Sequence, residues 1–128
     1  MLNHHSPSTV AAPFSRYSHG VEAPAGARWL YISGQVGVTP DGRIAEGAEA
    51  QIEQAWRNVL SVLEAAGMGP RDLVKVTTFL IDRAHLPTAR TVRDRMLQGA
   101  APASTLLFVA GLASPEWLVE IEAVAATS

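Results

Sequence analysis

The sequence predicts an α+β fold in which two helices pack on one mixed β-sheet as a two-layer sandwich. Three observations support this fold class. Short segments rich in β-branched and aromatic residues alternate with turn signals that contain Gly and Pro. Residues 48–66 and residues 86–97 instead repeat apolar side chains at helical spacing. In chain order, the segments give the element order β-β-β-α-β-α-β-β.

Length and composition fit one domain. The chain has 128 residues, of which 48% are hydrophobic and 17% charged, as in globular rather than disordered proteins. We expect a flexible polar arm over residues 1–13, which include Pro7 and Pro13, and a single domain over residues 14–128. So small a domain has little volume for a deep pocket of its own, which favours a site shared between subunits.

Composition also excludes several chemistries. The chain has no cysteine, and therefore no disulfide, thiolate nucleophile or Cys-ligated metal. The lack of cysteine and of a secretory signal fits the cytoplasm. No apolar run reaches the roughly 20 residues that span a bilayer.

The net charge of −2 argues against nucleic acid as the main partner. His4 and His5 suggest a metal site, but no third ligand is near, so a frayed terminus explains them better.

The first third of the chain has the pattern of a β-meander. Residues 16–21 and 27–33 have strand character, and Pro24–Gly26 between them is a turn signal. A second turn signal at residues 39–42 precedes a third, short strand at residues 43–45.

Residues 48–66 give the clearest helical pattern. Apolar side chains recur at the spacing of one helix face, namely at Ile52, Ala55, Trp56, Val59, Leu60 and Leu63. Gly67 stands where a left-handed C-terminal cap is expected. We expect this stripe to pack on the sheet as core rather than to contact a cofactor.

The second half of the chain predicts three more strands and one more helix. Residues 72–81 are β-branched and apolar, as in a buried strand. Residues 86–97 follow helical spacing and tolerate Pro87 because it falls in the first turn. Residues 104–110 and 118–125 complete the sheet.

Several short motifs in this order resemble the YjgF/YER/endoribonuclease L-PSP family, also called the reactive-intermediate deaminase or RidA family. The matching segments are Tyr17–Val21, Tyr31–Gln35, Gln54–Val59, Leu63–Gly67, Asp72–Thr77 and Val119–Ala125. The resemblance implies a chorismate-mutase-like fold and a homotrimer with clefts between subunits. It also implies hydrolysis of enamines and imines, made from amino acids, to a 2-oxo acid and ammonia, without a metal or organic cofactor.

The resemblance assigns roles to residues on several elements. Glu120 matches an acidic residue proposed to position the attacking water, and Glu122 shares its strand face. Tyr17 matches a tyrosine that lines the cleft, and Ser33 and Gly34 match a Ser-Gly-Gln signature beside it. The alternative interpretations are a solvated strand face for the two carboxylates and a structural strand bend at Gly34.

One position departs from the family pattern. Deaminase-type members hold the substrate carboxylate with the Arg of a Pro-Ala-Arg-Ser/Thr motif, and the corresponding residues 102–105 end in Ser104 and Thr105. A serine hydroxyl replaces a bidentate guanidinium, and losing such a charged contact costs about 2–5 kcal/mol. Either the substrate differs, or another arginine binds it, or the chemistry is lost. Arg90, which shares a helix face with Arg93, is the candidate substitute, although both arginines also fit a solvated face.

These residues support one main hypothesis and two alternatives. The main hypothesis is a RidA-like homotrimer that hydrolyses imines of altered structure, with Glu120 as the catalytic group. The first alternative is a trimer that binds a small metabolite, or regulates, without catalysis. The second is a ribonuclease or translation inhibitor, against which stand the net charge and the lack of a histidine acid/base pair.

Overall fold

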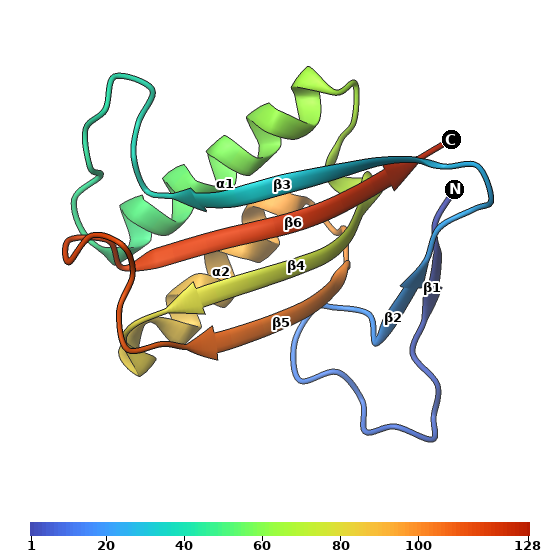
Figure 1. The fold of residues 1–128 in the computed structure, drawn as a ribbon. Coiled ribbons are helices and arrows are strands. Elements are labelled where there is room, and N and C mark those ends of the chain that lie inside the picture. Colours follow the sequence, from blue (N-terminus) through green and yellow to red (C-terminus); the bar gives the residue numbers. More distant parts are fainter.

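A four-stranded mixed sheet forms the centre of the computed structural model, which describes all 128 residues (Figure 1). The strand order is β3-β6-β4-β5. The bounds are Arg28–Val36 for β3, Leu73–Leu80 for β4, Ala103–Phe108 for β5 and Val119–Thr127 for β6. Strands β4 and β5 run parallel, and β6 is antiparallel to both of its neighbours. The predicted mixed sheet is therefore confirmed.

Two helices cover the same face of this sheet (Figure 1). Helix α1 spans Ala48–Ala65, and helix α2 spans Leu86–Leu97. Short 3-10 turns at Pro70–Asp72 and Arg83–His85 follow α1 and precede α2, respectively. The predicted stripe of α1 is core, because five of its members are buried and Leu60 is partly buried against them; the five are Ile52, Ala55, Trp56, Val59 and Leu63. Gly67 has a φ of 71°, in the left-handed region expected of a residue that ends a helix.

Side chains alternate between the two faces of the sheet. Val76 and Leu80 of β4 and Ile121 of β6 are buried on the helix side. Their strand neighbours point away from the helices, where no element of this chain covers them. We call this surface the open face; it bears Tyr31, Ser33, Lys75, Thr77, Phe79, Thr105, Leu107, Glu120, Glu122 and Val124.

The N-terminal region differs from the expectation. Asn3–His5 form strand β1, which pairs with β2 at Gly20–Glu22, so part of the predicted flexible arm lies in a two-stranded sheet. The predicted strand at residues 43–45 is wrong, because only an isolated bridge joins Val38 to Ile44. The order β-β-β-α-β-α-β-β is found nonetheless, with β1 as its first strand. The side chains of β1 are exposed and carry no apolar alternation, so periodicity gives no sign of it.

Neither helix combines the length and the apolar character that a membrane crossing needs.

Candidate functional site at the sheet edge

A hollow of about 250 Å³ lies at the exposed edge of β5, between that strand and α2. We call it the edge hollow. It is lined by Phe14, Ser15, Tyr17, Leu86, Arg90, Arg93, Ser104, Leu106 and Phe108. Three residues singled out in the sequence, Tyr17, Arg90 and Ser104, therefore meet here.

The alternation of β5 decides which of its residues reach the edge hollow. Ser104, Leu106 and Phe108 lie on the helix side of the strand and line it. Thr105 lies between them and points to the open face, where its hydroxyl oxygen is 2.6 Å from the Lys75 Nζ that donates to it. The structure thus separates Thr105 from Ser104, although the motif at residues 102–105 predicts both in one site.

Arg93, for which the sequence suggested a solvated helix face together with Arg90, instead lines the edge hollow. Arg93 is only 8% exposed, whereas Arg90 is exposed at the rim of the edge hollow. Its Nε and Nη2 donate to Oδ1 of Asp94 at 3.1 and 3.0 Å, and no hydrogen bond engages Nη1. Asp94, whose side chain is 40% exposed, pairs with Arg93 on one side of the guanidinium, so Nη1 is the nitrogen left to donate to a ligand. Helical periodicity offered a sign, because the spacing of apolar residues over 86–97 places either Val92 or Arg93 on the inner face of this helix.

Tyr17 closes another side of the edge hollow. Its hydroxyl oxygen accepts a hydrogen bond from the Phe14 backbone N–H at 3.3 Å, which holds residues 14–17 over the hollow. The ring also packs edge-to-face on His19, with centroids 5.8 Å apart. Because the tyrosine oxygen accepts this bond, its own hydrogen remains free for a ligand.

The remaining predicted residues lie on the open face. Gly34 sits at a bulge between Ile32 and Gln35, and the Glu120 carboxylate lies directly over it. A Cβ at position 34 would stand 1.9 Å from Glu120 Oε2, so only glycine leaves room for this placement. Ser33 lines a shallow second hollow of about 210 Å³ on the same face, together with Glu122.

The sheet therefore divides the predicted site into two groups. Tyr17, Arg90 and Ser104 lie at the edge hollow, on the helix side. Ser33, Gly34, Thr105 and Glu120 lie on the open face, and β4 separates β6 from the edge strand β5. A small ligand in the edge hollow of one chain does not reach Glu120 of that chain.

A mixed sheet with two helices on one face and a hollow at its edge strand defines a two-layer α+β protein. The family model described as endoribonuclease L-PSP matches residues 8–127. The chain belongs to this family, which is the RidA/YjgF family.

Similar proteins support the same assignment. The chain is 36% identical over 122 residues to the 2-iminobutanoate/2-iminopropanoate deaminase of Mus musculus, covering 92% of this chain and 87% of that protein. The crystal structure of YyfB, a Rid-family protein of unknown function from Yersinia pestis, matches with a TM-score of 0.89 at 34% identity, over 98% of each chain. RidA from the Antarctic bacterium Psychrobacter sp. matches with a TM-score of 0.75 at 32% identity, over 91% of this chain and 92% of that one.

Proposed function

We propose that this protein is a RidA-type deaminase that hydrolyses a small anionic imine or enamine in clefts between the subunits of a homotrimer. One observation carries the proposal: Arg93 places a buried guanidinium in the edge hollow beside Ser104 and Tyr17. The deaminase named among the relatives at 36% identity supports the reaction class.

Arg93 supplies the charge that Ser104 lacks. The resemblance leads us to expect an arginine at position 104, and a serine there offers one neutral donor. The unengaged Nη1 of Arg93 donates a charge-assisted hydrogen bond to a carboxylate oxygen, and Tyr17 adds its hydroxyl. Because Arg93 enters from α2 and not from β5, the anion binds at a position shifted from the one that an arginine at position 104 would give it. The substrate therefore differs in shape from that of members with the strand arginine.

The water-activating group comes from a second copy. The open face exposes large apolar side chains, with Tyr31 76% and Leu107 46% exposed, and association would bury them. A neighbouring subunit that sets its open face against the edge hollow brings its Glu120 to the ligand held by Arg93 and Tyr17. One site then needs two chains, as the size of the domain led us to expect.

The proposed reaction uses Arg93 and Tyr17 of one chain and Glu120 of the neighbouring chain. Glu120 accepts a proton from water as the water oxygen attacks the imine carbon, and the imine nitrogen gains a proton. The resulting carbinolamine loses its nitrogen as ammonia while the carbon–oxygen double bond forms. The imine and one water thus give one oxo acid and one ammonia, with no redox change.

The test is an imine-trapping assay. An amino-acid oxidase generates imines from a panel of acidic and neutral amino acids, and semicarbazide traps what the protein has not hydrolysed. We expect faster imine loss with wild type, a rate lowered about 30-fold or more by Arg93→Gln, and partial recovery in Arg93→Lys. Arg57→Gln removes an equal charge from an exposed site on α1 and should leave the rate unchanged. Wild type without acceleration on any imine, or equal rates in Arg93→Gln and wild type, would contradict the proposal.

A non-catalytic metabolite-binding trimer is the second candidate. It is favoured by the lining of the edge hollow, which offers the donors Arg93, Tyr17 and Ser104 but neither a carboxylate nor a histidine. Thermal-shift screening distinguishes the two functions, since ligand-induced stabilisation without turnover supports binding alone.

A further inference from the structure

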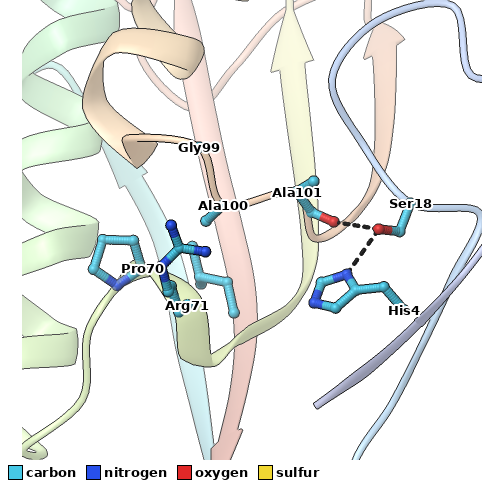
Figure 2. Close-up of a pocket in the computed structure, with 8 residues that line it drawn as sticks. His4, Ser18, Pro70, Arg71, Gly99, Ala100 and Ala101 are labelled. Atoms are coloured by element: carbon cyan, nitrogen blue, oxygen red, sulfur yellow. Dashed lines mark hydrogen bonds between the residues drawn. The ribbon is translucent and has the colours of Figure 1, made fainter. Parts of the chain in front are cut away.

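A separate hollow of about 270 Å³ lies between β1, the turn after α1 and the segment that follows α2 (Figure 2). Its lining residues are His4, Ser18, Pro70, Arg71, Leu73, Gly99, Ala100 and Ala101. None of them lines the edge hollow or the shallow hollow on the open face. The proposed deaminase reaction uses none of these side chains.

Hydrogen bonds fix the imidazole of His4 in this hollow. The Ser18 hydroxyl donates to the Ala101 carbonyl oxygen at 2.7 Å, and His4 Nδ1 lies 2.8 Å from the same hydroxyl oxygen. A serine hydroxyl has a single hydrogen, which Ala101 receives, so Nδ1 of His4 is the donor to Ser18. The other ring nitrogen, Nε2, has no protein partner and lies on the side of Arg71 in Figure 2.

Arg71 supplies a cation with no counterion in the chain. Its guanidinium takes part in no ion pair, and the adjacent Asp72 carboxylate is engaged by the Gly69 backbone N–H at 2.9 Å. The guanidinium lies along the loop after α2, where a Cβ at Gly99 would be 3.7 Å from Arg71 Nη2. Gly99 has a φ of 91°, which keeps this position free of a side chain.

We propose that this His4–Arg71 hollow binds a small phosphate monoester, with the phosphate between the Arg71 guanidinium and His4 Nε2. Phosphate oxygens accept the charge-assisted hydrogen bonds that the guanidinium fork offers. A phosphate monoester has its second pKa at about 6, so near neutral pH it is either a dianion or a monoanion with one acidic hydrogen.

The acidic hydrogen of the monoanion distinguishes a phosphate monoester from a carboxylate as a ligand for His4. The neutral His4 ring has its hydrogen on Nδ1, so Nε2 is an acceptor and needs a donor from the ligand. A monoanionic phosphate provides that donor, and a dianion pairs equally with the imidazolium form. A carboxylate at neutral pH has no hydrogen to give, so it leaves Nε2 of the neutral ring without a partner, and to the imidazolium form it offers one negative charge where the phosphate dianion offers two.

The shape of the hollow limits what the phosphate carries. Its volume of about 270 Å³ is just below the roughly 300–1,000 Å³ typical of pockets for drug-sized ligands. Pro70, Leu73 and Ala100 form apolar walls beside the two polar groups. A phosphate on a short carbon chain fits this lining, whereas a nucleotide is too large.

Calorimetric titration of the full chain tests the site, with glycerol 3-phosphate and inorganic phosphate as probes and acetate as the carboxylate. We expect saturable binding of both phosphates by wild type and binding weaker by about 10-fold or more in Arg71→Gln. Ser18→Ala should weaken binding severalfold, because it releases the His4 ring without removing a charge. Arg71 is exposed, so its replacement should leave the fold intact, which circular dichroism verifies.

Arg43→Gln is the matched control, because it removes the same charge from the turn between β3 and α1, where Arg43 pairs with Asp41. We expect it to bind like wild type. The proposal is overturned if wild type shows no saturation, if Arg43→Gln weakens binding as much as Arg71→Gln, or if acetate binds as tightly as phosphate. The result is independent of imine hydrolysis, which Arg71→Gln should leave unchanged.

Discussion

The Glu120 carboxylate lies over the α-carbon of Gly34, close enough that a Cβ on that glycine would stand 1.9 Å from Oε2 and 2.7 Å from Cδ of Glu120. Both short distances involve the carboxyl group itself, so a methyl group at position 34 forces the whole group to move. Gly34 is therefore a positioning residue for Glu120.

The first prediction uses this contact. Gly34→Ala should lower the rate of imine hydrolysis by about 10-fold or more, since displacement of a catalytic group by 1 Å or so can cost 100-fold. The free energy of unfolding should change little, because Gly34 has no positive φ that demands glycine. Kinetics and urea unfolding measure the two effects. Gly111→Ala is the control, with no atom within 4 Å of the added Cβ. Equal activity in wild type and Gly34→Ala would show that Gly34 does not position Glu120 for catalysis.

The second prediction concerns the junction of the two helices. Glu53 on α1 binds Arg57 of the same helix at 2.8 Å and Arg95 of α2 at 2.7 Å. The hydrogen bond from Arg57 and the nearby Arg95 lower the pKa of Glu53 below its usual value. A lowered pKa in the folded state stabilises the protein above the unfolded-state pKa of about 4.3, and this stabilisation is lost as the pH falls through the folded-state pKa.

Glu53→Gln should therefore lower the free energy of unfolding by about 0.2–1 kcal/mol at pH 7, the usual range for ion pairs at the surface. The difference from wild type should shrink as the pH drops below about 4. Urea unfolding across this pH range measures it. Glu64→Gln, at an exposed site near the end of α1 with no ion pair, should show no such pH dependence. A stability difference between Glu53→Gln and wild type that persisted well below about pH 4 would show that the ion pairs of Glu53 do not cause it.

The third prediction concerns Gln51, which ties the start of α1 to the segment before β6. Its Nε2 donates to the Glu116 carbonyl oxygen at 3.1 Å, and its Oε1 accepts from the Leu118 N–H at 2.9 Å. Gly37 makes room, because a Cβ there would lie 2.5 Å from the Gln51 Cα. Gln51→Leu leaves two backbone groups without partners and should cost about 1–3 kcal/mol in unfolding free energy. Gln54→Leu is the control, as Gln54 bonds only the Asn58 side chain.

Much of this fold was predictable because its patterns are local. The α2 bounds Leu86–Leu97 match the predicted range, and the predicted range of α1 is one residue longer than Ala48–Ala65. Both helices have a wide apolar stripe and a defined end, as the left-handed Gly67 illustrates. Strand β4 lies within one residue of each end of the predicted range 72–81, because its run of β-branched and apolar residues is also a local pattern.

The site was less predictable because its geometry depends on contacts distant in sequence. Periodicity places Ser104 and Thr105 on opposite faces of a strand, yet the motif that contains both suggests one site. Burial of Arg93 depends on β5, Tyr17 and α2 meeting at one edge, which no single segment encodes. Strand β1 likewise depends on its pairing with β2, since its own side chains are all exposed.

The last prediction tests whether the open face joins subunits. Tyr31 is 76% exposed in a single chain and lies opposite Val124 on the open face. If this face is buried in a trimer, Tyr31→Glu adds a third carboxylate to a face that already bears Glu120 and Glu122, and because burying it is costly we expect dissociation to monomers. Light scattering coupled to size-exclusion chromatography measures the mass, which for wild type should be three times that of one chain.

Val10→Glu is the matched control, because Val10 is 48% exposed in the N-terminal segment, outside the sheet. It should stay trimeric. Tyr31→Glu should also lose imine hydrolysis, because in a monomer Glu120 no longer lies at the edge hollow of a neighbouring chain. The residues that line the hollow remain in place in each chain, namely Arg93, Tyr17 and Ser104. An active monomer would refute the shared site, since the sheet of one chain separates Glu120 from the edge hollow. A wild-type monomer would refute the trimer itself, and loss of activity without dissociation would assign Tyr31 to the site instead of the interface.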